Sequence, residues 1–197
     1  MIKNIGARGN WKYANRGMSL EYDLGVTNEY YLTNDIAIIY KKPTPITISK
    51  VNYPSRAEAV IKEGYFRTPS TTDYNGVYKG RYIDFEAKET RSHSSFPLNN
   101  IHTHQIEHLK RISKHGGIGF LIVRFTTINK TFLLTFDDLL SFLNENARKS
   151  IPLSYFEESG HMIKDKYNPR TDYLSIIDKL YFGGRKWKMN LWIWRFF

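Results

Sequence analysis

The chain has 197 residues, 41% of them hydrophobic, and 29 lysines and arginines against 19 acids give a formal net charge of +10. This length suits one domain with a substantial core, and the apolar content excludes a disordered chain. The basic excess favours a polyanionic partner, nucleic acid before an anionic membrane, without separating the two. Cysteine is absent, which excludes disulfides and thiolate metal sites and is compatible with a reducing cytoplasm.

No membrane-spanning segment is expected. The N-terminus lacks the apolar stretch of a signal peptide. The longest apolar runs, such as residues 120–123, are far shorter than the roughly 20 residues that a span needs. We therefore expect a soluble, cytoplasmic protein without a membrane partner.

The first 14 residues contain three basic residues and no acid. They predict either a flexible basic arm that contacts phosphates or an ordinary frayed terminus. A first helix is predicted from Asn15 or Ser19 to about Thr33, because apolar residues recur there at helical spacing. The apolar run within residues 35–42 predicts a short buried strand.

Residues 44–70 give conflicting signals. Ile46, Ile48 and Val51 alternate with polar residues, as in a strand. Residues 55–58 instead have the pattern of a helix capping box, and Gly64 suits the end of a helix. The segment is therefore predicted as either extended or helical, and a crossover helix packed on a sheet is one alternative.

The stretch from Val77 to Lys88 predicts two strands joined by a tight turn. Side chains alternate between the two faces of a strand, so Tyr82, Asp84, Glu86 and Lys88 are expected on one face. Three of these side chains are charged: Asp84, Glu86 and Lys88. Charged groups on one face of an otherwise buried strand are unfavourable unless something binds there. This stretch is the main candidate for a functional site.

Asp73 lies thirteen positions before Glu86, so a hairpin would bring its carboxylate back beside Glu86. The two carboxylates and the Ala87 carbonyl would form an oxygen-lined site for a hard cation such as Mg²⁺. Lys88 would point into the same space, where its ammonium group would stabilise charge on a phosphate. The same residues also fit a non-catalytic, architectural DNA-binding protein whose acids are paired with Lys88 and Arg81.

A second helix is predicted over residues 100–115 and ends at two glycines. One of its faces should meet the sheet: Ile101, Gln105, His108 and Ile112. Gln105 is therefore expected near the metal site. His102, His104 and His108 suggest zinc, but no cysteine or acid completes a tetrahedral set, which favours solvated or DNA-facing histidines.

The rest of the chain predicts two strands, at residues 118–125 and 130–136, and two helices. Asp137 is expected to cap the first of these helices, and residues 173–180 should form the second. Residues 183–197 interleave basic and aromatic side chains, which suits stacking on unpaired bases or a buried or dimer-forming strand.

An acid followed by Glu-x-Lys across a strand–turn–strand resembles the core of the PD-(D/E)xK nuclease superfamily. Longer blocks resemble the RecU family, the Holliday junction resolvases of Gram-positive bacteria. These blocks are residues 15–21 (NRGMSLE), 41–45 (KKPTP), 69–76 (PSTTDYNG) and 83–90 (IDFEAKET). The resemblance covers about residues 15 to 180, with the blocks in the family's order.

The resemblance implies an α/β, restriction-endonuclease-like fold, with a mixed central sheet flanked by helices. Residues 15–197 would form one nuclease domain, and a protruding stalk at about residues 44–70 would enter the centre of a four-way junction. The stalk region supplies candidate DNA-binding residues: Lys42, Lys50, Arg56, Lys62 and Arg67.

The implied activity is Mg²⁺-dependent hydrolysis of phosphodiesters, with Mn²⁺ as an alternative metal, in homologous recombination and DNA repair. Asp73, Glu86 and Lys88 would be catalytic. The implied metal ligands are Thr71, Asp73, Glu86 and Gln105, with Glu21 as an accessory acid. A nuclease of the same fold that cuts duplex DNA is the alternative within the enzyme class.

The implied DNA partner is a four-way junction. Resolving it requires symmetric cuts on two strands, so a two-fold homodimer is expected. A recombinase or a branch-migration protein would be a further partner, and the protein would be associated with the nucleoid in the cytoplasm.

Overall fold

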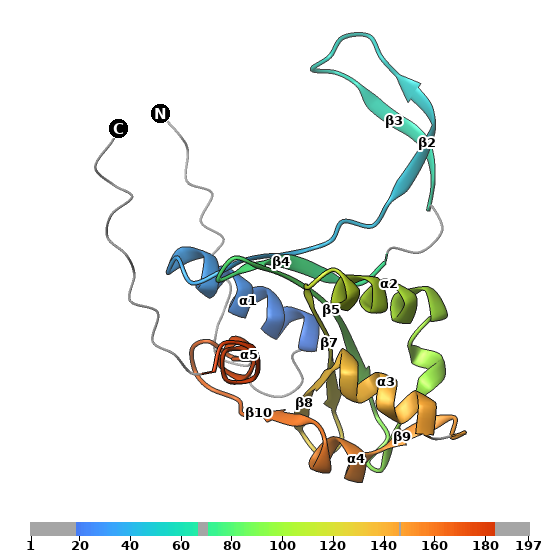
Figure 1. The fold of residues 1–197 in the computed structure, drawn as a ribbon. Coiled ribbons are helices and arrows are strands. Elements are labelled where there is room, and N and C mark those ends of the chain that lie inside the picture. Colours follow the sequence, from blue (N-terminus) through green and yellow to red (C-terminus); the bar gives the residue numbers. More distant parts are fainter. Residues whose placement is uncertain (1–18, 67–70, 146, 184–197) are drawn as a thin grey trace.

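The computed structural model describes residues 19–66, 71–145 and 147–183. Figure 1 shows a central sheet with helices on both sides and a two-stranded ribbon that projects away from it. The predicted basic arm at residues 1–14, Arg67 and the aromatic tail after Gly183 lie outside the described residues. No helix in the described ranges is long and apolar enough to cross a membrane.

The central sheet of the described chain has six strands, in the order β1-β4-β5-β7-β8-β10. Their bounds are Ile38–Lys41 (β1), Tyr74–Tyr78 (β4), Arg81–Thr90 (β5), Ile118–Phe125 (β7), Lys130–Thr135 (β8) and His161–Ile163 (β10). β5 and β7 run parallel, whereas the other neighbouring pairs are antiparallel. The predicted mixed sheet is thus confirmed.

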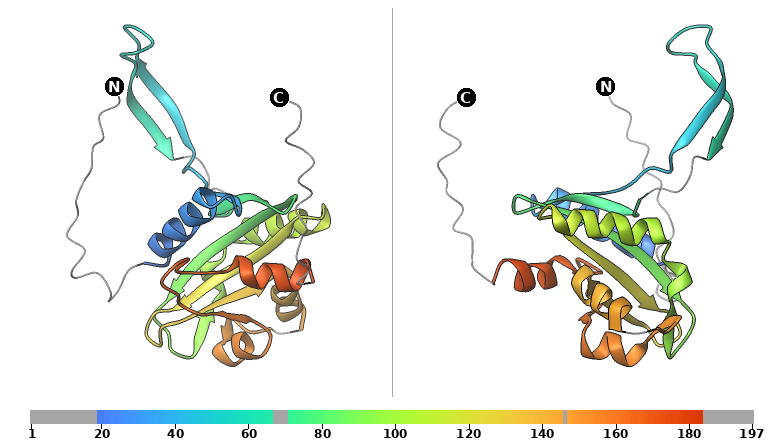
Figure 2. Two further views of the ribbon diagram at one scale, coloured as in Figure 1. Left: turned by 90° about the vertical axis from the view of Figure 1, so that its left-hand side faces the viewer. Right: turned by 45° about the vertical axis from the view of Figure 1, so that its right-hand side comes forward.

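Helices cover both faces of this sheet (Figure 2). α1 and α5 pack on one face, and α2, α3 and α4 pack on the other. Their bounds are Leu20–Thr33 (α1), Thr103–Lys114 (α2), Phe136–Glu145 (α3), Leu153–Glu158 (α4) and Leu174–Tyr181 (α5). A second small pairing joins β6 (Ser95–Pro97) to β9 (Ser150–Pro152), and the short 3-10 helix η2 (Leu98–Asn100) follows β6.

The two cores follow from the alternation of side chains along the strands. On β5, Ile83 and Phe85 enter the core beneath α1 and α5. Asp84 and Glu86 therefore point to the face covered by α2, where both are fully buried. The two acids of the charged face predicted for this strand therefore lie inside the protein, whereas Tyr82 and Lys88 on the same face are partly exposed.

Most predicted elements have the expected type, and several boundaries agree closely. α1 begins where expected, because Ser19 Oγ accepts a hydrogen bond from Tyr22 N at 3.3 Å. The prediction that Asp137 caps α3 was wrong. The helix begins at Phe136, two residues earlier than a cap at Asp137 predicts, and Thr135 Oγ1 accepts the hydrogen bond from Asp138 N at 3.1 Å.

β4 and β5 form the predicted hairpin. Lys79 and Gly80 at its turn both have positive φ, 46° and 74°, as expected for a two-residue turn that matches the strand twist. β4 begins at Tyr74, earlier than predicted, and β1 pairs with it closely. A Cβ atom on Gly76 would lie 2.0 Å from the Ile38 carbonyl oxygen, so glycine permits this approach.

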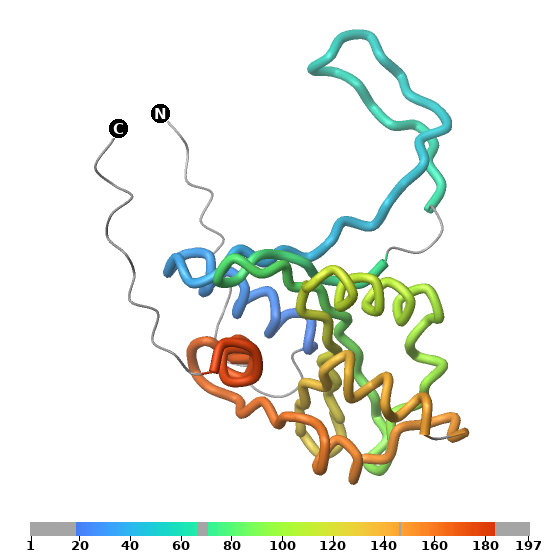
Figure 3. Tube along the Cα trace, viewed as in Figure 1, coloured from blue at the N-terminus to red at the C-terminus, as the bar shows by residue number. Residues whose placement is uncertain are grey.

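The segment that gave conflicting signals is extended. β2 (Ile46–Asn52) and β3 (Val60–Phe66) form a separate antiparallel sheet, and the tube in Figure 3 follows it away from the body. The crossover helix was wrong: Ser55 and Glu58 are hydrogen bonded to each other within the connection between the strands. Every residue of both strands is exposed, so the local helix pattern has no core against which to pack.

Candidate active site

Asp73 stands at the entrance to β4, directly beside β5. Tyr74 pairs with Phe85 in the hairpin, so Asp73 and Glu86 occupy the next positions along the two strands. Ala87 N donates a hydrogen bond to Asp73 Oδ2 at 3.3 Å. The structure therefore brings Asp73 back beside Glu86, as the hairpin argument predicts.

Glu86 is a buried carboxylate, and Lys88 is its one ion-pair partner among the described residues. Its side chain has no exposed surface, and Oε1 lies 2.6 Å from Lys88 Nζ. Within the described residues, neither carboxylate oxygen has a hydrogen bond of regular geometry. A buried acceptor with unused lone pairs is unfavourable unless a further positive group reaches it.

The protonation of Glu86 reflects this environment. The pKa of Glu86 is raised to about 7, mainly by burial and also by the nearby charge of Asp73, although Lys88 and Gln105 act in the opposite direction. The two acids thus repel each other across the hairpin. A divalent cation between them would remove that repulsion and supply the missing partner of the buried oxygens, so these residues fit such an ion.

A cavity of about 230 Å³ opens beside Asp73 and Lys88. Its walls include the start of α1 and the end of β5, which are joined by a hydrogen bond from Leu20 N to Glu89 Oε1 at 2.7 Å. Glu21 also lines the cavity, but its side chain is largely exposed and paired with Lys41. The structure therefore places Glu21 at the rim, and its accessory role stays a prediction.

Gln105 lies beside Glu86 and Thr71 is two residues before Asp73, but both have other hydrogen bonds. Gln105 is buried, its amide lowers the pKa of Glu86, and its Oε1 accepts from His102 N at 3.0 Å as part of the start of α2. Thr71 Oγ1 accepts from Lys42 Nζ at 3.0 Å. Their roles as metal ligands stay predictions.

Lys42 was predicted to bind DNA, but its ammonium group points inward. The Lys42 side chain is 15% exposed, and its Nζ lies 2.8 Å from Asp84 Oδ2. Asp84 also contacts His108 Nε2 at 3.1 Å and accepts from the Tyr82 hydroxyl at 3.0 Å. The pattern of β5 placed Asp84 on the same face as Glu86, but nothing in the sequence indicated that Lys42 pairs with it.

The three histidines that suggested zinc do not converge on one point. The rings of His102 and His104 stack with their centres 5.4 Å apart, while His108 faces Asp84. Across the described ranges, no group of three or more histidine and acidic side chains is arranged to hold a metal ion. Two acids with a backbone carbonyl and water remain an adequate set for Mg²⁺, which usually keeps several waters.

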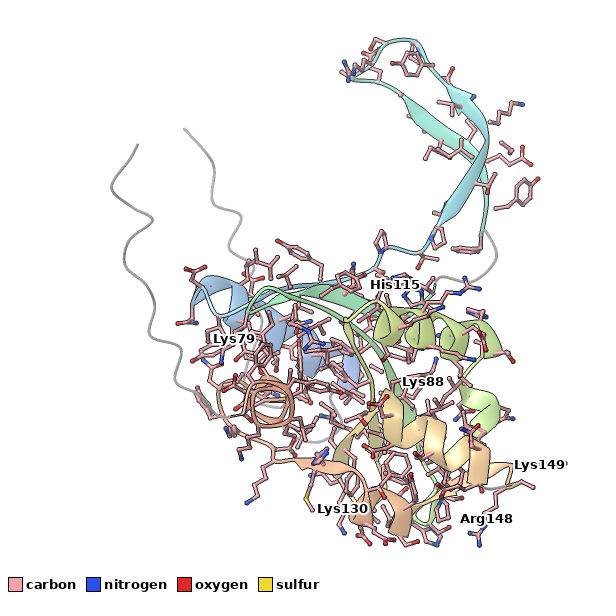
Figure 4. The ribbon with its side chains drawn as sticks, in the orientation of Figure 1. Lys79, Lys88, His115, Lys130, Arg148 and Lys149 are labelled. Atoms are coloured by element: carbon pink, nitrogen blue, oxygen red, sulfur yellow. The ribbon has the colours of Figure 1, made fainter. Side chains whose placement is uncertain are left out.

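The other candidate DNA-binding residues lie on the ribbon. Lys50 is on β2, Lys62 is on β3 and Arg56 lies in the connection between them, and all are exposed. Lys88, in contrast, lies on the side of the sheet covered by α2 and α3 (Figure 4). The basic residues therefore separate into an exposed set on the ribbon and an inward-facing pair, Lys42 and Lys88.

Comparisons with known proteins identify the family. A family model described as "Recombination protein U" matches residues 15–179. The Holliday junction resolvase RecU of Geobacillus sp. (strain WCH70) is 56% identical over 174 residues, 87% of each chain. That of Bacillus cytotoxicus is 54% identical over 174 residues, again 87% of each chain.

Among solved structures, the Holliday junction resolvase Hjc of Archaeoglobus fulgidus has a TM-score of 0.44 and 14% sequence identity, covering 73% of this chain and 93% of its own. The family model and the identities above span most of the chain. The chain therefore belongs to the RecU family.

Proposed function

We propose that this protein is a structure-selective endonuclease that resolves four-way DNA junctions by metal-dependent hydrolysis of phosphodiesters, in homologous recombination and DNA repair. The names of its relatives support the four-way junction as the substrate. The observation that carries the chemistry is Glu86, a fully buried carboxylate beside the second acid Asp73, with its pKa raised and Lys88 against one of its oxygens.

Asp73, Glu86 and the Ala87 carbonyl would hold Mg²⁺ or Mn²⁺, with Thr71 and Gln105 as further ligands. When bound there, the cation neutralises charge on the phosphate and lowers the pKa of a water molecule. Lys88 reaches the same cavity, where its ammonium group stabilises the negative charge that develops on the phosphate. Its contact with Glu86 fixes the position of that charge before DNA enters.

The ribbon formed by β2 and β3 gives the protein a means of choosing a branched substrate. It projects from the body and carries Lys50, Arg56 and Lys62 on an exposed surface (Figure 1). Phosphate contacts along such a ribbon depend on the path of the backbone and not on base edges. We therefore propose that the ribbon occupies the open centre of the junction.

Symmetric cutting requires two sites, and one face of the sheet suits a second copy. Ile38, Val77 and Tyr82 are neighbours across β1, β4 and β5, and their side chains are 38–51% exposed. Two chains of net charge +10 repel each other, so an uncharged apolar patch is a favourable place for them to meet. We propose a two-fold homodimer that uses this face, in the cytoplasm and close to the nucleoid.

The decisive experiment compares a mobile four-way junction with a linear duplex of equal length, in Mg²⁺ and in Mn²⁺. Asp73→Asn and Glu86→Gln should abolish cutting while junction binding, measured in Ca²⁺, is retained. Equal cutting of both substrates would identify a duplex nuclease of the same fold. Binding without any cutting by the unmutated protein would identify an architectural protein.

A further inference from the structure

Asp84 is a fully buried acid that the proposed chemistry does not use. Its Oδ1 accepts a hydrogen bond from the Thr72 hydroxyl, and its Oδ2 accepts from Lys42 Nζ and from the Tyr82 hydroxyl. His108 Nε2 lies 3.1 Å from the same oxygen. Satisfying one buried carboxylate so completely draws several distant segments of the chain to one point.

Two of these segments are the roots of the ribbon. Lys42 is the residue after β1, where the chain leaves the body for β2, and Thr71 and Thr72 stand where it has returned. Lys42 Nζ donates to Thr71 Oγ1 at 3.0 Å and to Thr72 Oγ1 at 2.7 Å, as well as to Asp84. The segment that leads from the body to the ribbon and the segment that leads back are thus joined to each other and to β5.

The same contacts lead directly to the proposed metal ligands. Thr72 is the neighbour of Asp73, whose backbone carbonyl accepts from Lys42 N at 2.7 Å. Asp84 is two positions before Glu86 on one strand face. His108 lies on α2 one turn after Gln105. Asp84 therefore bonds to the segments that carry these ligands.

We propose that Asp84 is a positioning residue that fastens both roots of the ribbon to the metal site, so that the seating of the ribbon on DNA sets the position of Asp73. This inference rests on the proposed function. A ribbon correctly placed in a junction keeps the Lys42–Asp84 contact, and Asp73 then faces Glu86. These contacts are formed in the structure described above, and a substrate that displaces the ribbon would move its roots, and Asp73 with them.

A purely structural ion pair would behave differently. Such a pair, when broken, lowers the melting temperature without a specific effect on metal affinity or substrate choice. Loss of a group that orients metal ligands typically lowers metal affinity by 10–100-fold. The two roles therefore separate when stability, metal affinity and selectivity are measured on the same variants.

Asp172→Asn is the matched control for Asp84→Asn. Asp172 also pairs with a lysine and a tyrosine hydroxyl, Lys166 and Tyr31, but it precedes α5 and makes no contact with the ribbon roots. Measurements on each protein would be Mn²⁺ affinity by calorimetry without DNA, the ratio of junction to duplex cutting rates, and the melting temperature. Asp84→Asn should weaken Mn²⁺ binding by about tenfold and lower the cutting ratio several-fold, whereas Asp172→Asn should change only the melting temperature.

Two further variants test the network if Asp84→Asn does not fold. Thr72→Val replaces one hydroxyl with a methyl group of nearly the same volume. It should also weaken Mn²⁺ binding. Lys42→Met combined with Thr72→Val should lose no more Mn²⁺ affinity than the worse single variant, because both changes break one unit. Independent, additive losses would contradict a shared network.

Unchanged Mn²⁺ affinity and an unchanged cutting ratio in Asp84→Asn, with the wild-type protein active, would overturn this inference and leave the proposed function standing. A wild-type protein that binds Mn²⁺ but cuts no DNA would overturn the proposed function, while the Mn²⁺ affinities of the variants would still decide the role of Asp84. A wild-type protein that binds no Mn²⁺ would overturn both.

Discussion

Lys88 Nζ lies 2.6 Å from Glu86 Oε1, and the two residues share one face of β5. The Lys88 side chain is 25% exposed while that of Glu86 is fully buried, and Lys88 is one of the residues that line the cavity beside Asp73. The Glu86 carboxylate suits a cation held between acids, and the Lys88 ammonium group suits a phosphate that enters from solvent.

Replacing Lys88 with methionine should remove most of the cutting activity. The change keeps the length of the side chain but removes the charge that would stabilise the phosphate, and losses of this kind are about 10²–10³-fold in rate. Single-turnover cutting of a four-way junction measures the effect. Lys79→Met is a close control, because Lys79 has similar exposure, 23%, and pairs with Asp178 at the hairpin turn. An equal loss in both variants would show that the effect is general.

Glu86→Gln should change how the stability of the metal-free protein depends on pH. Burial raises the pKa of Glu86 from its ordinary value of 4.5 to about 7. The neutral form is therefore favoured by folding, and this contribution is complete below pH 4.5 and is lost as the pH rises through 7. The full difference corresponds to about 3 kcal/mol.

The measurement is the free energy of unfolding in urea, at a series of pH values from 4.5 to 8.5 and in the presence of a chelator. Wild type should lose stability relative to Glu86→Gln over this window, by up to about 3 kcal/mol. Divalent cation should restore the wild type at high pH and have little effect on the variant. Parallel pH curves for the two proteins would contradict a raised pKa.

Much of this fold follows from sequence pattern alone. Buried strands such as β7 and the hairpin turn at Lys79 and Gly80 are determined by local apolar runs and turn chemistry. The sequence of the ribbon was ambiguous because its local pattern conflicts with the structure that it adopts. Its capping-box residues Ser55 and Glu58 fit a helix locally, and only the lack of any surface to pack against excludes it.

The site was predictable where its residues are close in sequence. Glu86 and Lys88 follow from the alternation of one strand, and Asp73 follows from one hairpin. The Lys42–Asp84 pair was not, because it joins residues 42 positions apart. From the sequence, a lysine beside a projecting basic segment is predicted to contact phosphate. Only the fold shows that a buried acid, Asp84, lies within reach of Lys42.

The basic residues of the ribbon should set the salt dependence of DNA binding. Replacing Lys50, Arg56 and Lys62 with glutamine should lower the slope of log affinity against log salt by about 2–3, since each phosphate contact contributes about 0.9. Binding to a four-way junction in Ca²⁺ at several salt concentrations measures the slope. A control triple variant uses Lys130, Arg148 and Lys149, which lie at the opposite end of the body from the ribbon (Figure 4). An equal change of the slope in the two triple variants would show that the junction does not bind preferentially to the ribbon.

Val77→Asp should convert the proposed dimer to a monomer. The substitution puts a charge between Ile38 and Tyr82 on the exposed face, where a second copy would have to bury it. Light scattering at micromolar concentration measures the mass, and a junction assay should show single nicks in place of paired cuts. Met162→Asp, at an exposed site on β10, is the control. A monomeric wild type would contradict the proposal directly.

Gly76→Ala should be strongly destabilising even though it adds one methyl group. The new Cβ would lie 2.0 Å from the Ile38 carbonyl oxygen and 2.6 Å from Ile39 Cα, and both are backbone atoms that cannot move without separating β1 from β4. We expect a loss of about 3 kcal/mol in urea unfolding.

Gly25→Ala is the control, because nothing lies within 4 Å of its Cβ position in α1 and alanine should stabilise that helix by up to about 1 kcal/mol. Separating β1 from β4 also moves Lys42, whose backbone N–H bonds to Asp73. Any Gly76→Ala protein that remains folded at low temperature should therefore bind Mn²⁺ more weakly than Gly25→Ala. Equal Mn²⁺ affinity in the two folded variants would show that Asp73 keeps its position without β1.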